Sequence, residues 1–238
     1  MPSVVVRLRF SKLGKVRWTS HRDVARMWER AFRRAGVTVQ YTGGFSPRPK
    51  VSFGLALPTG HESFAEYLDV HLADTGPAGV DVLTLPGRLT PALPNGIDVT
   101  GALALDAGSP SLQHEVTSCS WEVELDTTGL QQRIDVVLGA ASLMVTRERK
   151  GHRVTDDIRP AIRSLAVAAP ASGGGRLVAE LATQPRGLRP AELLGALDVD
   201  VADCLVRRTH QWIERDGARV EPVSLDATGA PHAGARAS

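Results

Sequence analysis

Ser20, His21 and Asp23 have the side-chain types of a nucleophilic triad, so they are the first candidates for chemistry. At the start of a helix, neighbours one and three positions apart cannot form the sequential hydrogen-bond chain that a serine hydrolase uses. His21 can still act as a general acid or base on RNA, because imidazole titrates near neutral pH. The favoured alternative is that these residues cap the helix. His21 is therefore the one catalytic candidate, and its competing role is structural.

A metal site is not predicted. Glu62, Glu66 and Asp69 form a small acidic set, but strand alternation places Glu66 and Asp69 on opposite faces. We expect these carboxylates to form salt bridges with the basic residues that precede them. The two cysteines, Cys119 and Cys204, lie far apart in the sequence and have no neighbours at metal-ligand spacing. The sequence thus predicts no metal, no disulfide framework and no cofactor.

Positive charge is concentrated in the first fifty residues. They contain twelve Lys or Arg and two Asp or Glu, a local balance of +10 in a chain whose net charge is +2. Residues 51–238 consequently carry −8. A polyanion responds to the local field of such a patch rather than to the sum over the molecule. We therefore expect a polyanionic partner, and RNA is the preferred class.

Many of these charges follow the period of one helix, predicted to begin at Thr19 or Ser20 and to end at Ala35-Gly36. Four arginines fall within about 80 degrees of one another on this helix, and the apolar residues lie on the opposite side. The arginines are Arg22, Arg26, Arg30 and Arg33, and the apolar residues are Val24, Trp28, Ala31 and Ala35. Glu29 can neutralise part of the stripe through Arg33, four positions later. One face is predicted to pack and the other to bind anions, although a merely solvated face is the alternative.

The segment that follows, Gly43-Gly44-Phe45-Ser46-Pro47-Arg48-Pro49-Lys50, is also suited to anions. Glycines let backbone N–H groups approach a phosphate, and the flanking prolines keep Arg48 out of a helical conformation. Tyr41, Phe45 and Trp18 are predicted either to stack on unpaired bases or to be core residues. The predicted anion-binding or nucleic-acid-binding residues are Lys12, Arg17, His21, Arg22, Arg26, Arg30, Arg33, Tyr41, Gly43, Gly44, Phe45, Arg48 and Lys50.

Periodicity predicts an α+β fold. In the N-terminal half we expect strands at 4–10, 37–41, 50–57, 66–72 and 97–104, and helices at 20–35 and near 80–85. In the C-terminal half we expect strands at 118–126, 142–149, 152–157, 161–169 and 176–183, and helices at 130–139 and from 189. The βαββ order recurs, which predicts two ferredoxin-like halves packed together. The predicted domains are 1–105 and 111–225, followed by a disordered tail at 226–238.

A chain of 238 residues with 42% hydrophobic content is long enough for two modest cores. Its apolar runs are all much shorter than the roughly 20 residues that cross a bilayer. Residues 1–10 alternate charged and apolar positions instead of forming the core of a signal peptide. We therefore expect a cytoplasmic protein that does not contact a membrane.

Residues 10–69 also carry a family resemblance. The matching residues are Phe10-Ser11-Lys12, Gly14, Arg17, Ser20-His21-Arg22-Asp23, Glu29–Gly36, Tyr41, Gly44–Lys50, Pro58, Gly60, Glu62, Ser63 and Glu66–Asp69. On these residues the chain resembles the radical-SAM-associated, or radical-SAM-linked, protein family of unknown function in its stand-alone form. Weaker matches at Asp157–Pro160 and Arg189–Leu194 extend the resemblance toward Glu221. That family often has His where this chain has Arg48, which argues against a catalytic histidine there.

The resemblance implies a partner, because members of that family occur beside a radical-SAM enzyme or as a segment that follows one. Such an enzyme needs three closely spaced cysteines for its iron–sulfur cluster, and the two distant cysteines of this chain cannot supply them. The resulting hypothesis is a non-catalytic companion of a radical-SAM enzyme that binds RNA, for example tRNA. Two alternatives stay open. One is a metal-independent RNA-processing enzyme that uses His21 and Lys50, and the other is a protein adaptor whose basic helix docks on an acidic partner.

Overall fold

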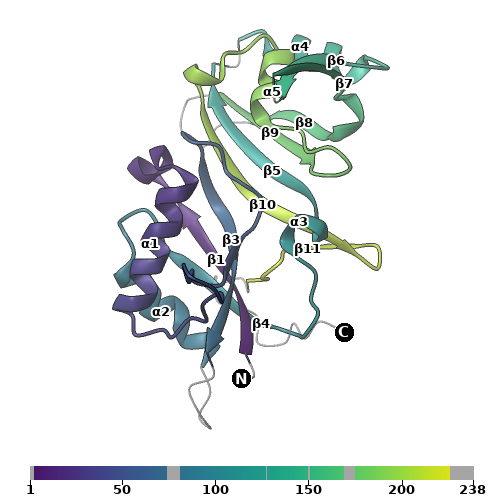
Figure 1. Cartoon of the computed structure of the whole chain (residues 1–238). Coiled ribbons are helices and arrows are strands. Elements are labelled where there is room, and N and C mark those ends of the chain that lie inside the picture. Colours follow the sequence, from purple (N-terminus) through teal and green to yellow (C-terminus); the bar gives the residue numbers. More distant parts are fainter. Residues whose placement is uncertain (1–2, 74–80, 127, 150, 169–174, 226–238) are drawn as a thin grey trace. The chain divides into compact units, whose positions relative to one another are not determined.

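A computed structural model describes residues 3–73, 81–126, 128–149, 151–168 and 175–225 (Figure 1). These residues form antiparallel sheets and a few helices, which confirms the predicted α+β class. The chain divides into two compact units, one from Met1–Glu115 with Glu214–Ser238 and the other from Val116–Ile213. The second unit is thus inserted into the sequence of the first, whereas the sequence predicted two consecutive halves that meet at 106–110. The tail predicted to be disordered, 226–238, lies outside the described residues.

The sheet of the first unit has the antiparallel order β4-β1-β3-β2. Its strands are β1 (Ser3–Lys12), β2 (Val51–Phe53), β3 (Glu62–Ala73) and β4 (Val99–Leu105). Helix α1 (His21–Arg34) connects β1 to β2, and α2 (Leu85–Leu89) connects β3 to β4. The shorter elements of this unit are 3-10 helices at Gly14–Trp18, Val82–Thr84 and Thr90–Ala92, helix α3 (Leu112–Glu115) and strand β11 (Ala218–Val220).

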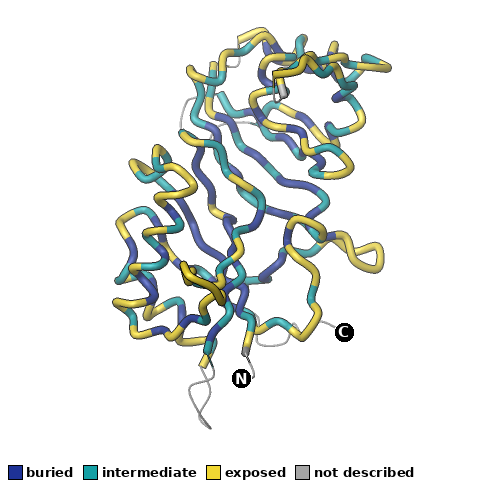
Figure 2. The backbone as a smooth tube through the Cα atoms, viewed as in Figure 1, coloured by how far each residue is buried: buried dark blue, intermediate teal, exposed yellow. Residues whose placement is uncertain are grey.

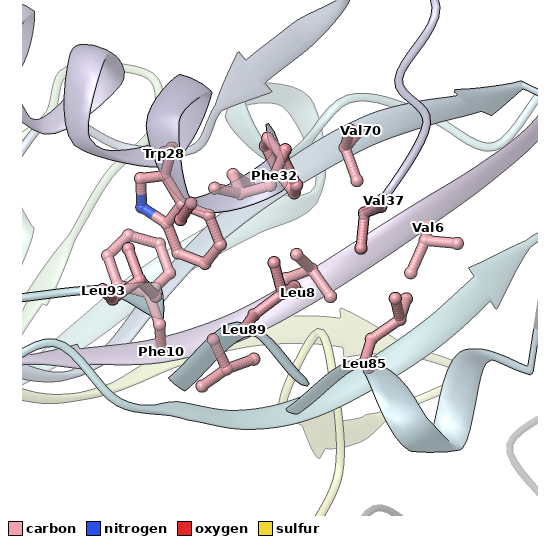
Figure 3. Close-up of a cluster of buried hydrophobic side chains, with 14 of the residues drawn as sticks. Val6, Leu8, Phe10, Trp28, Phe32, Val37, Val70, Leu85, Leu89 and Leu93 are labelled. Atoms are coloured by element: carbon pink, nitrogen blue, oxygen red, sulfur yellow. The ribbon is translucent and has the colours of Figure 1, made fainter. Parts of the chain in front are cut away.

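Alternation along β1 and the helical period of α1 create the core of the first unit. Val6, Leu8 and Phe10 occupy successive positions on one face of β1, and all three are buried. Trp28 and Phe32 of helix α1 pack against this face. The Trp28 and Phe10 rings meet edge to face, with their centroids 5.0 Å apart. The same cluster contains Val24, Ala31, Val70, Leu85, Leu89 and Leu93 (Figure 3). The predicted apolar side of the helix is therefore confirmed.

The opposite face of β1 holds a buried ion-pair network. The Arg7 guanidinium donates to both carboxylate oxygens of Asp69, at 2.8 and 3.0 Å, and to Glu115 at 2.9 Å. Burial opposes the charge on Arg7, but these hydrogen bonds outweigh burial and raise the pKa of the guanidinium. Arg215 donates to the second oxygen of Glu115 at 3.0 Å. The network therefore ties Arg215, in the segment of the chain that returns to the first unit, to β1 through Glu115.

Arg9, two positions along β1, is buried in the same way. Its guanidinium donates to the Tyr67 hydroxyl and to Glu221, each at 3.3 Å. Burial, reinforced by Glu221, raises the pKa of Tyr67 above its usual value. Val223 packs against Gly101 of β4, where an added Cβ would lie 3.0 Å from the Cγ1 of Val223. The strand interiors are accordingly buried in Figure 2, and neither Arg7 nor Arg9 adds exposed positive charge to the basic first fifty residues.

The strands of the second unit pair with one another in the antiparallel order β10-β5-β9-β8. Its strands are β5 (Val116–Leu125), β8 (Ile162–Ala168), β9 (Gly175–Ala182) and β10 (Leu205–Arg215). Helix α4 (Leu130–Gly139) follows β5, and α5 (Pro190–Ala196) follows β9. Strands β6 (Met144–Arg149) and β7 (His152–Asp157) form a separate hairpin, as predicted, and 3-10 turns lie at Arg159–Ala161 and Val201–Asp203.

Two predictions about individual elements are wrong. The strand expected at 37–41 is replaced by isolated bridges of Val39 with Leu72 and of Tyr41 with Pro49. Proline cannot donate a ladder hydrogen bond, so a regular strand pair does not extend past this point. The strand expected at 50–57 is reduced to the three residues of β2. Strand β10 was not predicted.

Candidate nucleic-acid interface

Ser20 and Asp23 fix the start of α1. The Ser20 hydroxyl oxygen accepts the Asp23 backbone N–H at 3.2 Å, and the hydroxyl donates to the Asp23 carboxylate at 2.7 Å. This exchange satisfies an otherwise free N–H group at the helix N-terminus, so the predicted capping role is confirmed. His21 is exposed, and its ring lies edge-on to Phe53 with centroids 5.0 Å apart. Ser20 and Asp23 therefore cap the helix, and His21 packs beside Phe53 instead of joining them in the hydrogen-bond chain of a serine hydrolase.

An open groove of about 610 Å³ runs between α1 and the segment that follows it. Arg22, Arg26 and Arg33 line one wall, and Arg48 lines the other. The remaining lining residues are Ala25, Glu29, Tyr41, Pro47 and Pro49. The structure thus brings together the two basic segments that the sequence singled out separately. The solvent-facing side of α1, which supplies one wall, is exposed in Figure 2.

The groove keeps a positive balance. Four arginines line it against one carboxylate, Glu29, which lies between Arg26 and Arg33 on the same side of α1. Asp23 lies 3.6 Å from Arg26, but both side chains are more than half exposed, so this pair neutralises little. Arg30 was predicted to belong to the stripe, yet it does not line the groove, because it lies about 80 degrees around the helix from Arg22.

The loop of residues 42–50, which supplies the second wall of the groove, is held closed by hydrogen bonds. The Thr42 backbone N–H donates to the Arg48 carbonyl at 2.8 Å, and the Arg48 N–H donates back to the Thr42 hydroxyl at 3.0 Å. Gly44 has a φ of +106°, a conformation that favours glycine. Below the loop, Lys50 N–H donates to the Gln40 carbonyl at 2.7 Å, and its own carbonyl accepts from His71 of β3 at 3.0 Å. The loop is therefore anchored to the sheet.

Three aromatic side chains stand in solvent. Trp18 is 64% exposed, Tyr41 is 52% exposed and Phe45, at the tip of the loop, is fully exposed at 110%. The alternative that they are core residues is therefore wrong. The Arg17 guanidinium lies 5.3 Å from the Trp18 ring centroid and 3.3 Å from Glu62. Tyr41 lines the groove, whereas Gly43, Gly44, Phe45 and Lys50 lie beyond its lining.

Lys12 and His21 lie elsewhere. Lys12 is 4% exposed, and its ammonium group donates to the carbonyls of Arg17 and Thr19 at 3.4 and 3.2 Å. Burial lowers the pKa of Lys12, and the nearby Glu66 carboxylate opposes that shift. Lys12, Glu66 and His21 line a separate cavity of about 30 Å³, room for roughly one water molecule. The sequence signal for this burial was available, since Lys12 continues the Val6, Leu8 and Phe10 row.

The predicted salt bridges of the acidic set are confirmed for Asp69 with Arg7 and for Glu62 with Arg17. Glu62 also accepts the backbone N–H of Gly14 at 2.7 Å. Among the described residues, no group of three or more His, Cys, Asp or Glu is placed to hold a metal ion. Within the same ranges, no helix is long and apolar enough to span a membrane.

Asp156 and Asp157, two acids of the second unit, join networks of ion pairs and hydrogen bonds within that unit. Asp156 pairs with Arg147 at 3.3 Å and with Arg186 at 2.8 Å. The Asp157 carboxylate accepts the backbone N–H groups of Leu143 at 2.7 Å and Arg159 at 3.0 Å. These hydrogen bonds favour the ionised carboxylate and lower the pKa of Asp157.

Replacing Asp157 by Asn is expected to destabilise the protein at pH 7 but not at strongly acidic pH. A depressed native pKa contributes stability above the unfolded value of about 3.9 and loses that contribution as pH falls through the native value. The thermal midpoints of wild type and D157N should therefore converge between pH 5 and pH 2. An offset that stays constant over this range would show that the carboxylate charge contributes nothing.

The residues that line the groove lie within the part of the chain that matches a known protein family. A family model described as "Uncharacterized protein conserved in bacteria (DUF2344)" matches residues 6–190. This match covers more than half of the chain and includes most of β1, all of α1, the loop of residues 42–50 and β3. No curated protein matches the chain.

Proposed function

We propose that this chain, which belongs to the DUF2344 family of uncharacterised proteins conserved in bacteria, is an RNA-binding companion of a radical-SAM enzyme without a catalytic step of its own. The observation that carries the RNA-binding part is the convergence of Arg22, Arg26, Arg33 and Arg48 on one open groove. The resemblance of residues 10–69 to radical-SAM-linked proteins supports the partner. The binding surface lies in the first unit and needs no residue of the second.

The proposal extends to the fold. In each unit the strand order, with a helix in each of two connections, is the order of a ferredoxin-like module. In the second unit the β6-β7 hairpin is an insertion between α4 and β8. We therefore propose two ferredoxin-like units, of which the first carries the RNA groove. Four-stranded sheets of this kind are common in RNA-binding proteins, although the proposed site is on a helix and a loop rather than on the sheet.

The chemistry of the groove suits a phosphate backbone. Guanidinium groups are planar, stay charged and bind phosphate oxygens in pairs of hydrogen bonds. Arg22 and Arg33 lie about 16 Å apart along the axis of α1, at 1.5 Å per residue. Three arginines over that length can contact phosphates along one strand of the proposed RNA, with Arg48 on the other wall of the groove. Binding is then governed by counterion release and depends on salt.

The decisive test reverses two groove charges. Arg26→Glu/Arg33→Glu is expected to weaken binding of a fluorescein-labelled, unstructured RNA 12-mer by about 100-fold or more, since hydrogen bonds to charged groups contribute roughly 1.5–3 kcal/mol each. Fluorescence anisotropy between 50 and 200 mM salt gives the dissociation constants. For wild type, the slope of log affinity against log salt should be about −3, as expected for four phosphates on a single strand.

The matched control is Arg30→Glu/Arg34→Glu, which changes the net charge equally on the same helix but away from the groove. Its effect should stay below about 10-fold at 0.1 M salt, where the Debye length is about 10 Å. Equal losses in both variants would show that net charge, not the groove, binds RNA. No binding by wild type would refute the RNA-binding proposal and favour the protein adaptor.

The same assay detects the RNA-processing alternative as shortened RNA. The structure favours Lys12 and Glu66 over Lys50 as neighbours of His21, since these three residues line one cavity. Turnover that His21→Ala abolishes while binding persists would support an enzyme.

The partner is tested separately by crosslinking in the native cell. Recovery of a protein with three closely spaced cluster-binding cysteines supports the companion role, and recovery of none contradicts it.

A further inference from the structure

Phe45 is the most exposed large hydrophobic side chain among the described residues. The other phenylalanines of the first unit are more covered: Phe10 and Phe32 are buried at 2% exposure, Phe53 is partly covered beside His21, and Phe64 is 40% exposed. A fully solvated phenyl ring gains nothing for folding, because its apolar area stays in water. The position therefore needs an explanation outside the stability of the fold.

The loop holds the ring away from the body of the unit. The two hydrogen bonds between Thr42 and Arg48 close the loop, and Gly44 turns the backbone at its tip. Pro47 and Pro49 further restrict the backbone. Because the loop is closed at its base and anchored to β3 through Lys50, the ring is presented in a preformed position. Little conformational entropy is then lost when it meets a ligand.

The distance from the groove fits one nucleotide. Phe45 precedes Arg48 by three residues, and an extended chain spans at most about 3.6 Å per residue, so the two Cα atoms lie within roughly 11 Å. Arg48 lines the groove and faces the proposed phosphate path, with the exposed Tyr41 ring beside it. A base attached to a phosphate at Arg48 can therefore reach one of the two rings.

We propose that Phe45 stacks on an unpaired base, so that the RNA recognised by the groove is single-stranded or has an unpaired nucleotide at that point. This inference rests on the proposed RNA-binding function. A phenyl ring has no hydrogen-bonding group, so it stacks without selecting one base over another. In a duplex the bases are already stacked on each other and their faces are inaccessible to the loop. The groove supplies the electrostatic part of binding, and Phe45 supplies the preference for unpaired RNA.

The test compares Phe45→Ala with Phe45→Trp in the full chain. Stacking contributes about 1–3 kcal/mol per base, so Phe45→Ala should weaken binding of the single-stranded 12-mer by about 5- to 150-fold, whereas Phe45→Trp should retain it. Binding of the same strand annealed to its complement should be unchanged by Phe45→Ala. The salt slope should also stay the same, because no arginine is altered. Leu83→Ala, another exposed hydrophobic residue, is the control.

A direct readout uses 2-aminopurine at successive positions of the 12-mer. Its fluorescence should change on binding at one or more positions for wild type and Phe45→Trp and should lose that change in Phe45→Ala. If the 12-mer binds wild type but Phe45→Ala alters neither affinity nor fluorescence, stacking by Phe45 is refuted and the arginine groove is retained. If wild type binds no RNA, the proposed function fails as well.

Discussion

Arg7→Ala is expected to lower the free energy of unfolding by about 3–5 kcal/mol, the usual loss when one partner of a buried ion pair is removed. Arg7 is 3% exposed and supplies hydrogen bonds to both Asp69 and Glu115. Without Arg7, the carboxylate of Asp69, which is only 14% exposed, loses the cation opposite it. Urea unfolding at pH 7 measures the loss.

Two further variants separate charge from geometry. Arg7→Lys keeps the charge but cannot reproduce the paired hydrogen bonds to Asp69, so we expect an intermediate loss. The double variant Arg7→Met/Asp69→Leu removes both charges and should lose less than Arg7→Ala, because a hydrophobic pair can replace a buried ion pair at little cost. A double variant that loses the sum of both single variants would show that the two residues do not interact.

Trp28→Ala should cost a similar amount, about 3–5 kcal/mol, and should weaken RNA binding too. The indole is 1% exposed, and it packs between Phe10 and Phe32 with ring centroids 5.0 and 5.5 Å away. The deletion leaves a cavity directly beneath the helix that carries the groove arginines (Figure 3). The arginines then lose a fixed spacing even though none is replaced. Thermal unfolding and the 12-mer assay measure the two effects.

Trp28→Phe is the matched comparison. Among the described residues, the indole N–H has no hydrogen-bond partner, so removing it relieves a buried unsatisfied donor while the smaller ring loses some contacts. We expect a loss below about 1.5 kcal/mol and unchanged RNA affinity. If Trp28→Ala unfolds at the same temperature as Trp28→Phe, the packing of α1 does not depend on this side chain.

Local signals explain what could be predicted from the sequence. Helix α1 carries a capping residue, a four-residue apolar period and a terminating Ala35-Gly36, and the structure has all three. Both walls of the groove come from residues 22–49, so a short connection alone brings them together. The loop tip was likewise visible as a run of glycines and prolines.

Long-range contacts explain what could not. Alternation puts Arg7 and Arg9 on the polar face of β1, and both were counted in the positive charge of the first fifty residues. Their carboxylate partners include Glu115 and Glu221, from distant parts of the chain. No local sequence pattern indicates that carboxylates so distant in the chain pair with these arginines. The charge count of the first fifty residues therefore overestimates the exposed positive charge.

Strand β10 was missed for a geometric reason. Its buried residues are Val206 and Arg208 before a register shift and Gln211 and Ile213 after it. The shift moves the buried positions from even to odd numbers, so the pattern loses its two-residue period. Two of the four buried residues are also polar, which hides the strand further.

The contact between Arg9 and Glu221 also has a consequence for folding during synthesis, because it can form only after nearly the whole chain has been translated. The two residues are 212 positions apart, so at about 5–20 residues per second Glu221 is synthesised some 10–40 seconds after Arg9. During that interval all of the continuous second unit is synthesised. The Trp28 cluster can form early, because its residues lie between Val6 and Ala102. The ionic face of β1 is closed last, so the unit that is translated first is finished after the unit inserted into it.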